Sequence, residues 1–268
     1  MYEEFFGLQE KAFSKTPDPR FLYLSGAHQE ALAQLEFAVE EKEIALLTGE
    51  IGCGKTLLSR ALMDRLDEGD YVIANVINPG LRATAFLRLV AQELGVAEPA
   101  RSKREVVDQL QERFLELHDE GQTPVVLIDE SQLIPGKDVF DEIRLLTNFQ
   151  LDSENLVAIV LLGQPELLRR LRRAAYRPLT QRIGADFHLT PLSAEDTDAY
   201  LAHRLKVAGA RQPIFTAEAA EAVHVHARGI PRSINNLATQ CLLEGLACEE
   251  TTISGPVVHR VAESMRFL

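Results

Sequence analysis

Over the first 190 residues, short apolar runs alternate with longer stretches that have helical spacing. Four apolar runs are predicted to be strands: 44–48, 71–76, 125–128 and 156–162. A fifth, shorter strand is predicted at 187–189. The helical stretches lie at about 27–41, 55–67, 83–94, 102–119 and 136–149. Runs that are apolar throughout indicate strands buried on both faces, so the pattern predicts an α/β fold whose parallel sheet is covered by helices on both faces.

The pattern changes at Pro191, after which it predicts helices only. Ser193 is an expected N-cap, and further helices are predicted at about 216–227, 231–248 and 254–265. Before the first predicted helix, residues 1–25 are rich in aromatics and proline, which indicates an ordered arm. We therefore expect three parts. These are an arm at 1–25, an α/β core at 26–190 and a small all-helical lid at 191–268.

Composition narrows the class of protein. The 268 residues carry a net charge of −12, which argues against non-specific binding of nucleic acid by the whole surface. The longest apolar run, 156–162, is far short of the ~20 residues that a membrane span needs. The N-terminus lacks the features of a signal peptide, and no cysteine–histidine grouping has zinc spacing. We expect a cytoplasmic protein without a membrane span.

Residues 49–56 match the pattern Gly-x-x-x-x-Gly-Lys-Thr between a predicted strand and a predicted helix. Glycines let the backbone N–H groups face phosphates, and the helix N-terminus adds partial positive charge. Lys55 is expected to reach the β- and γ-phosphates of ATP, and the Thr56 hydroxyl to ligate Mg²⁺. The expected nucleotide-binding residues are Gly49, Glu50, Ile51, Gly52, Cys53, Gly54, Lys55, Thr56, Leu57 and Asp129.

Two adjacent acids follow the predicted strand at 125–128. Asp129 stands where a Walker B carboxylate holds Mg²⁺ through water, so Thr56 and Asp129 are the expected metal residues. Glu130, one residue past the strand, can orient and deprotonate the attacking water. Without a P-loop, such a pair is usually surface charge. With this P-loop, the pair favours hydrolysis over nucleotide binding alone.

Two further polar residues stand at positions that suit a phosphate site. Gln164 follows the apolar strand at 156–162 and could position water; the alternative is a polar turn residue before Pro165. Arg232 falls in the first turn of the helix that Pro231 opens, where the helix dipole disfavours a cation. An arginine placed there needs an anionic partner such as the γ-phosphate, unless it is simply exposed.

These segments resemble the AAA+ superfamily and, more narrowly, the ExeA/GspA-type ATPases of general secretion, which are similar to TniB-like transposition ATPases. The resembling stretches are 2–8, 16–25, 47–56, 127–132, 162–167 and 229–235. The resemblance implies that Gln164 is the sensor 1 residue and Arg232 the sensor 2 residue. It also implies that the arm and residues 28–31 line the adenine side.

The same resemblance places an arginine finger at Arg182, with Arg177 and Arg173 as alternatives. A finger completes the ATP site of a neighbouring subunit, so it implies a homo-oligomer with shared sites. The run 169–182 holds six arginines and no acid, which fits either a solvated basic helix or an interface.

The sequence departs from the family at several points. Ala12 stands where the family usually has proline, and Cys53 where serine, threonine or alanine is commoner. Secretion members carry a membrane span and a peptidoglycan-binding region after the ATPase, and neither precedes Leu268, so the cell-wall function is not carried over. The leading hypothesis is an ATP-driven oligomeric switch for a secretion, pilus or exopolysaccharide export system. The alternative is an ATP-dependent, nucleic-acid-binding regulator of transposition, and a non-hydrolysing, nucleotide-gated scaffold is a third class.

Overall fold

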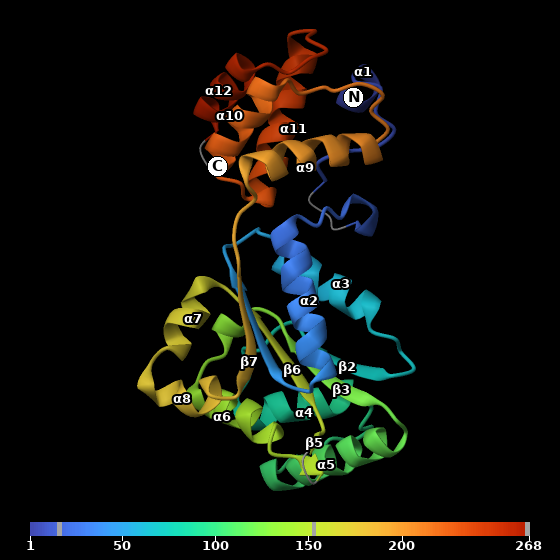
Figure 1. Cartoon of the computed structure of the whole chain (residues 1–268), viewed down its shortest axis with the longest axis vertical. Coiled ribbons are helices and arrows are strands. Elements are labelled where there is room, and N and C mark those ends of the chain that lie inside the picture. The colour runs from blue at the N-terminus through green and yellow to red at the C-terminus, as the bar shows by residue number, and fades with distance from the viewer. Residues whose placement is uncertain (15–17, 152–153, 266–268) are drawn as a thin grey trace. The chain divides into compact units, whose positions relative to one another are not determined.

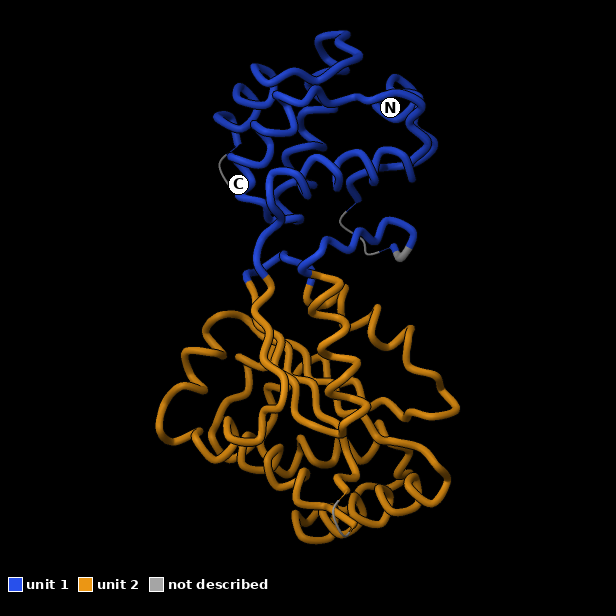
Figure 2. Tube along the Cα trace, in the orientation of Figure 1, with its two compact units in different colours: residues 1–27, 50–54, 190–268 blue, residues 28–49, 55–189 orange. Residues whose placement is uncertain are grey.

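The computed structural model describes residues 1–14, 18–151 and 154–265, and the chain divides into two compact units (Figure 2). The sheet unit comprises residues 28–49 and 55–189. The helical unit comprises residues 1–27, 50–54 and 190–268. Thr16 and Pro17, at the start of the second resembling stretch, lie outside the described residues.

The sheet unit is built on five parallel strands in the order β2-β3-β6-β1-β7 (Figure 1). Their bounds are β1 Ile44–Gly49, β2 Tyr71–Val76, β3 Thr123–Ile128, β6 Ala158–Gly163 and β7 Ile183–Leu189. The carboxyl ends of parallel strands meet at one edge, so the residues that follow β1, β3 and β6 come together there. Because β6 lies between β1 and β3, the residue after β6 stands between Gly49 at the end of β1 and the acid pair.

Helices cover both faces of this sheet, as the sequence predicts. The helices of the sheet unit are α2 Gly26–Glu40 from its third residue onward, α3 Lys55–Arg65, α4 Ala83–Glu93, α5 Lys103–Asp119, α6 Lys137–Leu146, α7 Pro165–Leu171 and α8 Arg177–Thr180. Ile44 and Leu46 of β1 belong to a fully apolar cluster with side chains of α4 to α8. Leu47, which is also fully buried, faces the other side, since side chains alternate along a strand. There α3 packs on β1 and β6 and buries Leu58 and Leu62.

The helical unit packs α9 to α12 around one apolar core. Their bounds are α9 Ala194–Val207, α10 Ala217–Ala227, α11 Pro231–Ala247 and α12 Gly255–Ser264. Ser193 caps α9 as expected, accepting a hydrogen bond from the backbone N–H of Asp196 at 3.0 Å. Burial raises the pKa of the core thiol Cys241 to about 12, so it behaves as an inert apolar group.

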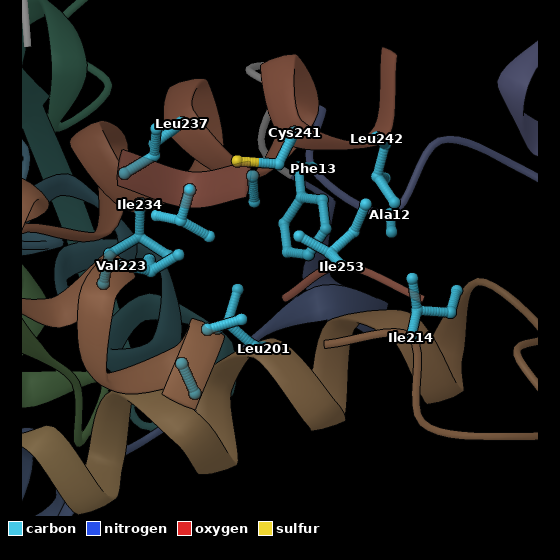
Figure 3. Close-up of a cluster of buried hydrophobic side chains, with 14 of the residues drawn as sticks. Ala12, Phe13, Leu201, Ile214, Val223, Ile234, Leu237, Cys241, Leu242 and Ile253 are labelled. Carbon is cyan, nitrogen blue, oxygen red and sulfur yellow. The ribbon is translucent and has the colours of Figure 1, made fainter. Parts of the chain in front are cut away.

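The N-terminal arm belongs to the helical unit and contributes to its core. It begins with α1, Tyr2–Phe5. Ala12 and Phe13 lie among Leu201, Ile214 and Ile253, as Figure 3 shows. The buried Arg204 of α9 fixes the arm, because its guanidinium donates to the backbone carbonyls of Ala12 at 2.7 Å and Ser14 at 3.5 Å.

The observed elements differ from the predicted ones mainly at the edges of the sheet. β7 begins at Ile183 rather than at 187, because half-buried and exposed residues alternate along this edge strand and it has no apolar run. The basic region after β6 is broken into α7, a 3-10 turn at Ala174–Tyr176 and α8. Two short strands, β4 Gln150–Leu151 and β5 Glu154–Asn155, form a hairpin that the sequence pattern did not predict. Among the described residues, none of the helices combines the length and the apolar character that crossing a membrane requires.

Candidate functional site

The glycine loop joins β1 to α3 in the conformation that its glycines were expected to supply. Gly52 and Gly54 have φ angles of +86° and +104°, a region that side chains disfavour. Gly49 lacks a side chain for a different reason, because a Cβ there would lie 2.8 Å from the carbonyl oxygen of Leu189 on β7. The buried Lys55 ammonium donates a hydrogen bond to the carbonyl of Gly49 at 2.7 Å, which holds it against the loop.

The remaining loop residues complete a tight turn before α3 begins. The backbone N–H of Cys53 donates to the carbonyl of Glu50 at 3.3 Å, and the Cys53 side chain is buried. Ile51 is 54% exposed, and Leu57 is half-buried in the first turn of α3. The backbone amides of the loop and the start of α3 are thus the groups available to face an anion.

The two residues expected to hold a metal lie side by side. The Thr56 hydroxyl donates to Oδ2 of Asp129 at 2.9 Å, although the two residues come from α3 and from the end of β3. Oδ1 of Asp129 accepts the backbone N–H of Glu130 at 2.8 Å, so the carboxylate is held at both oxygens. Asp129 is 5% exposed, and its neighbour Glu130 is more open.

Glu130 has a backbone conformation that non-glycine residues rarely adopt. Its φ is +50° and its ψ is +37°, in the left-handed region, at the point where β3 turns into the 3-10 helix Ser131–Leu133. Strain of this kind costs of order 1–3 kcal/mol and is found most often at functional sites. The turn directs the carboxylate toward the end of β6, where Gln164 Nε2 donates to Glu130 Oε2 at 3.2 Å.

Gln132 is a member of this cluster to which the sequence analysis assigned no role. Its side-chain Nε2 donates to Glu130 Oε2, and its Oε1 accepts the backbone N–H of Gln164 at 3.0 Å. In the sequence, Gln132 stands two residues beyond the acid pair, at the end of the resembling stretch 127–132. Neither feature indicates a role for its side chain until the turn is known.

The candidate finger Arg182 lies just before the amino end of β7, whereas the glycine loop follows the carboxyl end of β1. The first residue of β7 pairs with Ile44, and its last pairs with Gly49. About 20 Å of strand therefore separates Arg182 from the loop of its own chain. Its guanidinium donates to the Thr147 hydroxyl at 2.6 Å beside a cavity of about 300 Å³.

The alternative fingers and the sensor 2 candidate lie elsewhere. Arg173 and Arg177 line a second cavity of about 450 Å³ together with Arg172. Arg232 begins α11 in the helical unit, and its backbone N–H donates to the Gly52 carbonyl at 3.4 Å. A Cβ on Gly52 would lie 2.7 Å from Cβ of Arg232, so this contact adds a second reason for glycine at that position.

Comparison with known proteins agrees with the geometry. The AAA domain family profile matches residues 39–171, which run from the end of α2 to the end of α7 and include the glycine loop, the acid pair and Gln164. The chain belongs to the AAA+ superfamily. Within it, the chain is similar to general secretion pathway protein A of Aeromonas hydrophila, with 42% identity over 250 residues, which confirms the resemblance that the motifs predicted. That match covers 92% of this chain but only 45% of the relative.

Solved structures confirm the AAA+ fold, a P-loop parallel sheet followed by a helical part. The ORC2 protein of Aeropyrum pernix in ADPNP–ADP complexes superposes with a TM-score of 0.69 at 18% identity, covering 97% of this chain and 73% of that one. The Drosophila ORC bound to DNA gives 0.69 at 16% identity, covering 100% of this chain and 66% of that one. The RuvB Holliday junction branch migration motor of Thermotoga maritima gives 0.58 at 19% identity, covering 88% and 68%. At these identities the likeness concerns the fold alone.

Proposed function

We propose that this chain binds ATP with Mg²⁺ at residues 49–57 and Asp129 and hydrolyses it to ADP and phosphate. The observation that carries the proposal is the convergence of Thr56, Asp129 and Glu130 at one edge of the sheet, with 2.9 Å between the Thr56 hydroxyl and Asp129 Oδ2. A hydroxyl and a carboxylate held together at the start of a P-loop helix are what an Mg²⁺–phosphate site uses. The carboxylate after them supplies the base for hydrolysis.

The residues present fit both the nucleotide and the metal. Mg²⁺ prefers oxygen ligands and keeps several waters, and Thr56 and Asp129 offer only oxygen atoms. The loop offers backbone N–H groups at positive-φ glycines, a helix N-terminus and the Lys55 ammonium, which suit the phosphates. When bound, Mg²⁺ would neutralise charge on the β- and γ-phosphates.

The side chains then have distinct roles in hydrolysis. Glu130 orients the attacking water and accepts its proton, and Gln164 donates its amide beside the γ-phosphate. Lys55 stabilises the β- and γ-phosphate oxygens, and Arg232 supplies a cation as sensor 2. We assign Arg182 to the site of a neighbouring copy; the support is the register of β7, since about 20 Å of strand lies between Arg182 and the loop of its own chain.

We further propose that hydrolysis drives an oligomeric switch in a secretion, pilus or export machine. The support is the similarity to general secretion pathway protein A, of which this chain spans less than half. In this proposal residues 1–25 contribute to the nucleotide site, residues 26–190 form the ATPase core and residues 191–268 form the lid. A pull-down with the Glu130→Gln form in ATP tests it, and recovery of export-machine proteins only in ATP is the expected result.

Nucleic-acid-dependent regulation of transposition is a second candidate. Its support is the arginine cluster at 169–182, of which Arg172, Arg173 and Arg177 surround one cavity. An oligomer would multiply such a local basic patch. A salt-dependent DNA titration with and without an ATP analogue distinguishes the two candidates, and absence of binding at low salt excludes this one.

The metal site makes a specific prediction for Asp129→Asn. The variant should lose about 10–100-fold in affinity for a non-hydrolysed ATP analogue in Mg²⁺, as is typical when a group that orients the metal's ligands is removed. In EDTA its affinity should equal that of the wild type. Isothermal titration calorimetry measures both, and Asp119→Asn, at the exposed end of α5, is the matched control. An equal loss in EDTA would assign Asp129 a structural role instead.

A further inference from the structure

One amide side chain connects the ends of two neighbouring strands at the candidate site. Gln132 donates through Nε2 to Oε2 of Glu130, which follows β3. Through Oε1 it accepts the backbone N–H of Gln164, which follows β6, at 3.0 Å. A glutamine can donate and accept at once, and neither a carboxylate nor an ammonium can do so at neutral pH. Gln132 therefore forms a bridge that neither a carboxylate nor an ammonium could form in its place.

The local backbone is built to present this bridge. Ser131 is buried and donates its hydroxyl to the carbonyl of Ile128 at 2.9 Å, which anchors the turn to the end of β3. The backbone N–H of Leu133 donates to the Glu130 carbonyl at 2.8 Å, and this hydrogen bond closes the turn. Within this turn Leu133 is 54% exposed, whereas Gln132 is partly buried against β6.

Gly163 at the end of β6 makes room for the Gln132 amide. A Cβ at this position would lie 3.1 Å from Gln132 Oε1 and 2.5 Å from Cδ2 of Leu167. The φ of Gly163 is not positive, so close approach rather than backbone freedom explains the glycine. The space for Gln132 is thus provided from the neighbouring strand.

The side-chain amides of Gln132 and Gln164, which both contact Glu130, have different roles in the proposed mechanism. Gln132 and Gln164 both donate to the same oxygen, Oε2. If Gln164 turns its amide to the γ-phosphate, Glu130 loses one of these donors and retains Gln132. The Oε1 contact of Gln132 also fixes the backbone from which the Gln164 side chain extends.

From this geometry we infer that Gln132 is a positioning residue for hydrolysis. It holds Glu130 in its orientation toward the attacking water while Gln164 contacts the phosphate. The inference rests on the proposed function, because it assigns Gln132 an action through Glu130 and not on ATP itself. It predicts that Gln132 affects turnover and has little influence on the affinity for nucleotide.

The test replaces Gln132 by methionine, which has a similar length and forms neither hydrogen bond. We expect kcat for phosphate release to fall about tenfold, a part of the 10²–10⁴-fold that a general base contributes, while KM for ATP stays within about twofold. The matched control is Gln109→Met. Gln109 also bridges two groups with its amide, the Ala100 N–H at 2.8 Å and the Glu98 carbonyl at 3.2 Å, but it lies on α5. The control should keep the wild-type kcat.

A second variant, and the same substitution in a chain that already carries Glu130→Gln, distinguish a positioning role from a general loss of structure at the site. Gln132→Glu removes the donor and places two carboxylates together, so it should lower kcat more than Gln132→Met. In a Glu130→Gln background, Gln132→Met should change the residual single-turnover rate less than twofold, because Gln132 acts through Glu130.

Several outcomes would overturn the inference. A wild-type kcat in Gln132→Met would do so, as would a change in KM alone or a tenfold loss that persists in the Glu130→Gln background. If the wild-type chain itself released no phosphate, both the proposed function and this inference would fail. If the wild type is active and Gln132→Met matches it, only the inference fails.

Discussion

Glu130→Gln is expected to lose at least about a hundredfold in the rate of ATP hydrolysis while it still binds ATP. The amide keeps the size of the side chain and can still accept a hydrogen bond, but it cannot take a proton from water. Lys55, Thr56 and Asp129 remain in place, so affinity for ATP should stay within a few-fold of the wild type. Phosphate release and equilibrium titration with ATP measure the two quantities separately.

The matched control for this substitution is Glu166→Gln. Glu166 lies in the first turn of α7, two residues beyond Gln164. Within the part of the chain that the structure describes, its exposed carboxylate forms an ion pair with Arg169 alone. It should hydrolyse ATP at the wild-type rate, since exposed pairs of this kind contribute little. A Glu130→Gln variant with unchanged phosphate release would favour the non-hydrolysing scaffold instead.

Arg182→Ala is expected to reduce hydrolysis strongly without weakening ATP binding by the same chain. Arginine fingers are worth about 10³–10⁵ in rate in related phosphoryl-transfer chemistry. The residue lies at the amino end of β7, while the glycine loop follows the carboxyl end of β1, so any contribution must come from a neighbouring copy. Arg173→Ala and Arg177→Ala test the two alternative positions.

Mixing subunits tests whether this arginine acts in trans. Arg182→Ala chains keep an intact glycine loop, and Lys55→Ala chains keep an intact Arg182. In a mixed oligomer, some sites combine the intact glycine loop of one variant with the intact Arg182 of the other, so activity should exceed that of either variant alone. Mixtures that show neither rescue of activity nor inhibition of added wild-type chains would exclude a finger at Arg182.

The strands of the sheet were predictable where they form a largely apolar run, both for the buried β1, β3 and β6 and for the half-buried edge strand β2. β1, β2, β3 and β6 lie where the runs at 44–48, 71–76, 125–128 and 156–162 placed them, within two residues at each end. β7 was located only in part, because half-buried and exposed residues alternate along it and it has no continuous apolar run. The β4–β5 hairpin was missed because its strands are two residues long and mostly exposed.

The candidate site was predictable where its polar side chains come directly after the end of a strand. The proximity of Thr56 and Asp129 follows from the motif and the parallel sheet, and the structure places their side chains in hydrogen-bonding contact. The left-handed backbone of Glu130 and the Gln132 bridge were not predictable. Both depend on how a short 3-10 turn folds back over β6, and no periodicity in the sequence encodes that.

The sequence pattern predicts one boundary between the two compact units, but it does not predict which unit the N-terminal arm joins. The change at Pro191 is visible in the sequence and coincides with the end of β7, Leu189. The association of the arm with α9–α12 is not visible, because it depends on Phe13 entering an apolar core formed almost 200 residues later. Sequence patterns report local periodicity, whereas packing between distant segments depends on shape.

The most direct test of the central claim is phosphate release by the purified wild-type chain, measured against ATP, Mg²⁺ and protein concentration. We predict release that saturates with ATP, stops in EDTA and rises more steeply than linearly with protein concentration, because each site needs Arg182 from a second copy. Release that stays at the background level at every protein concentration, or that is unchanged in EDTA, would contradict the proposed Mg²⁺-dependent ATP hydrolysis.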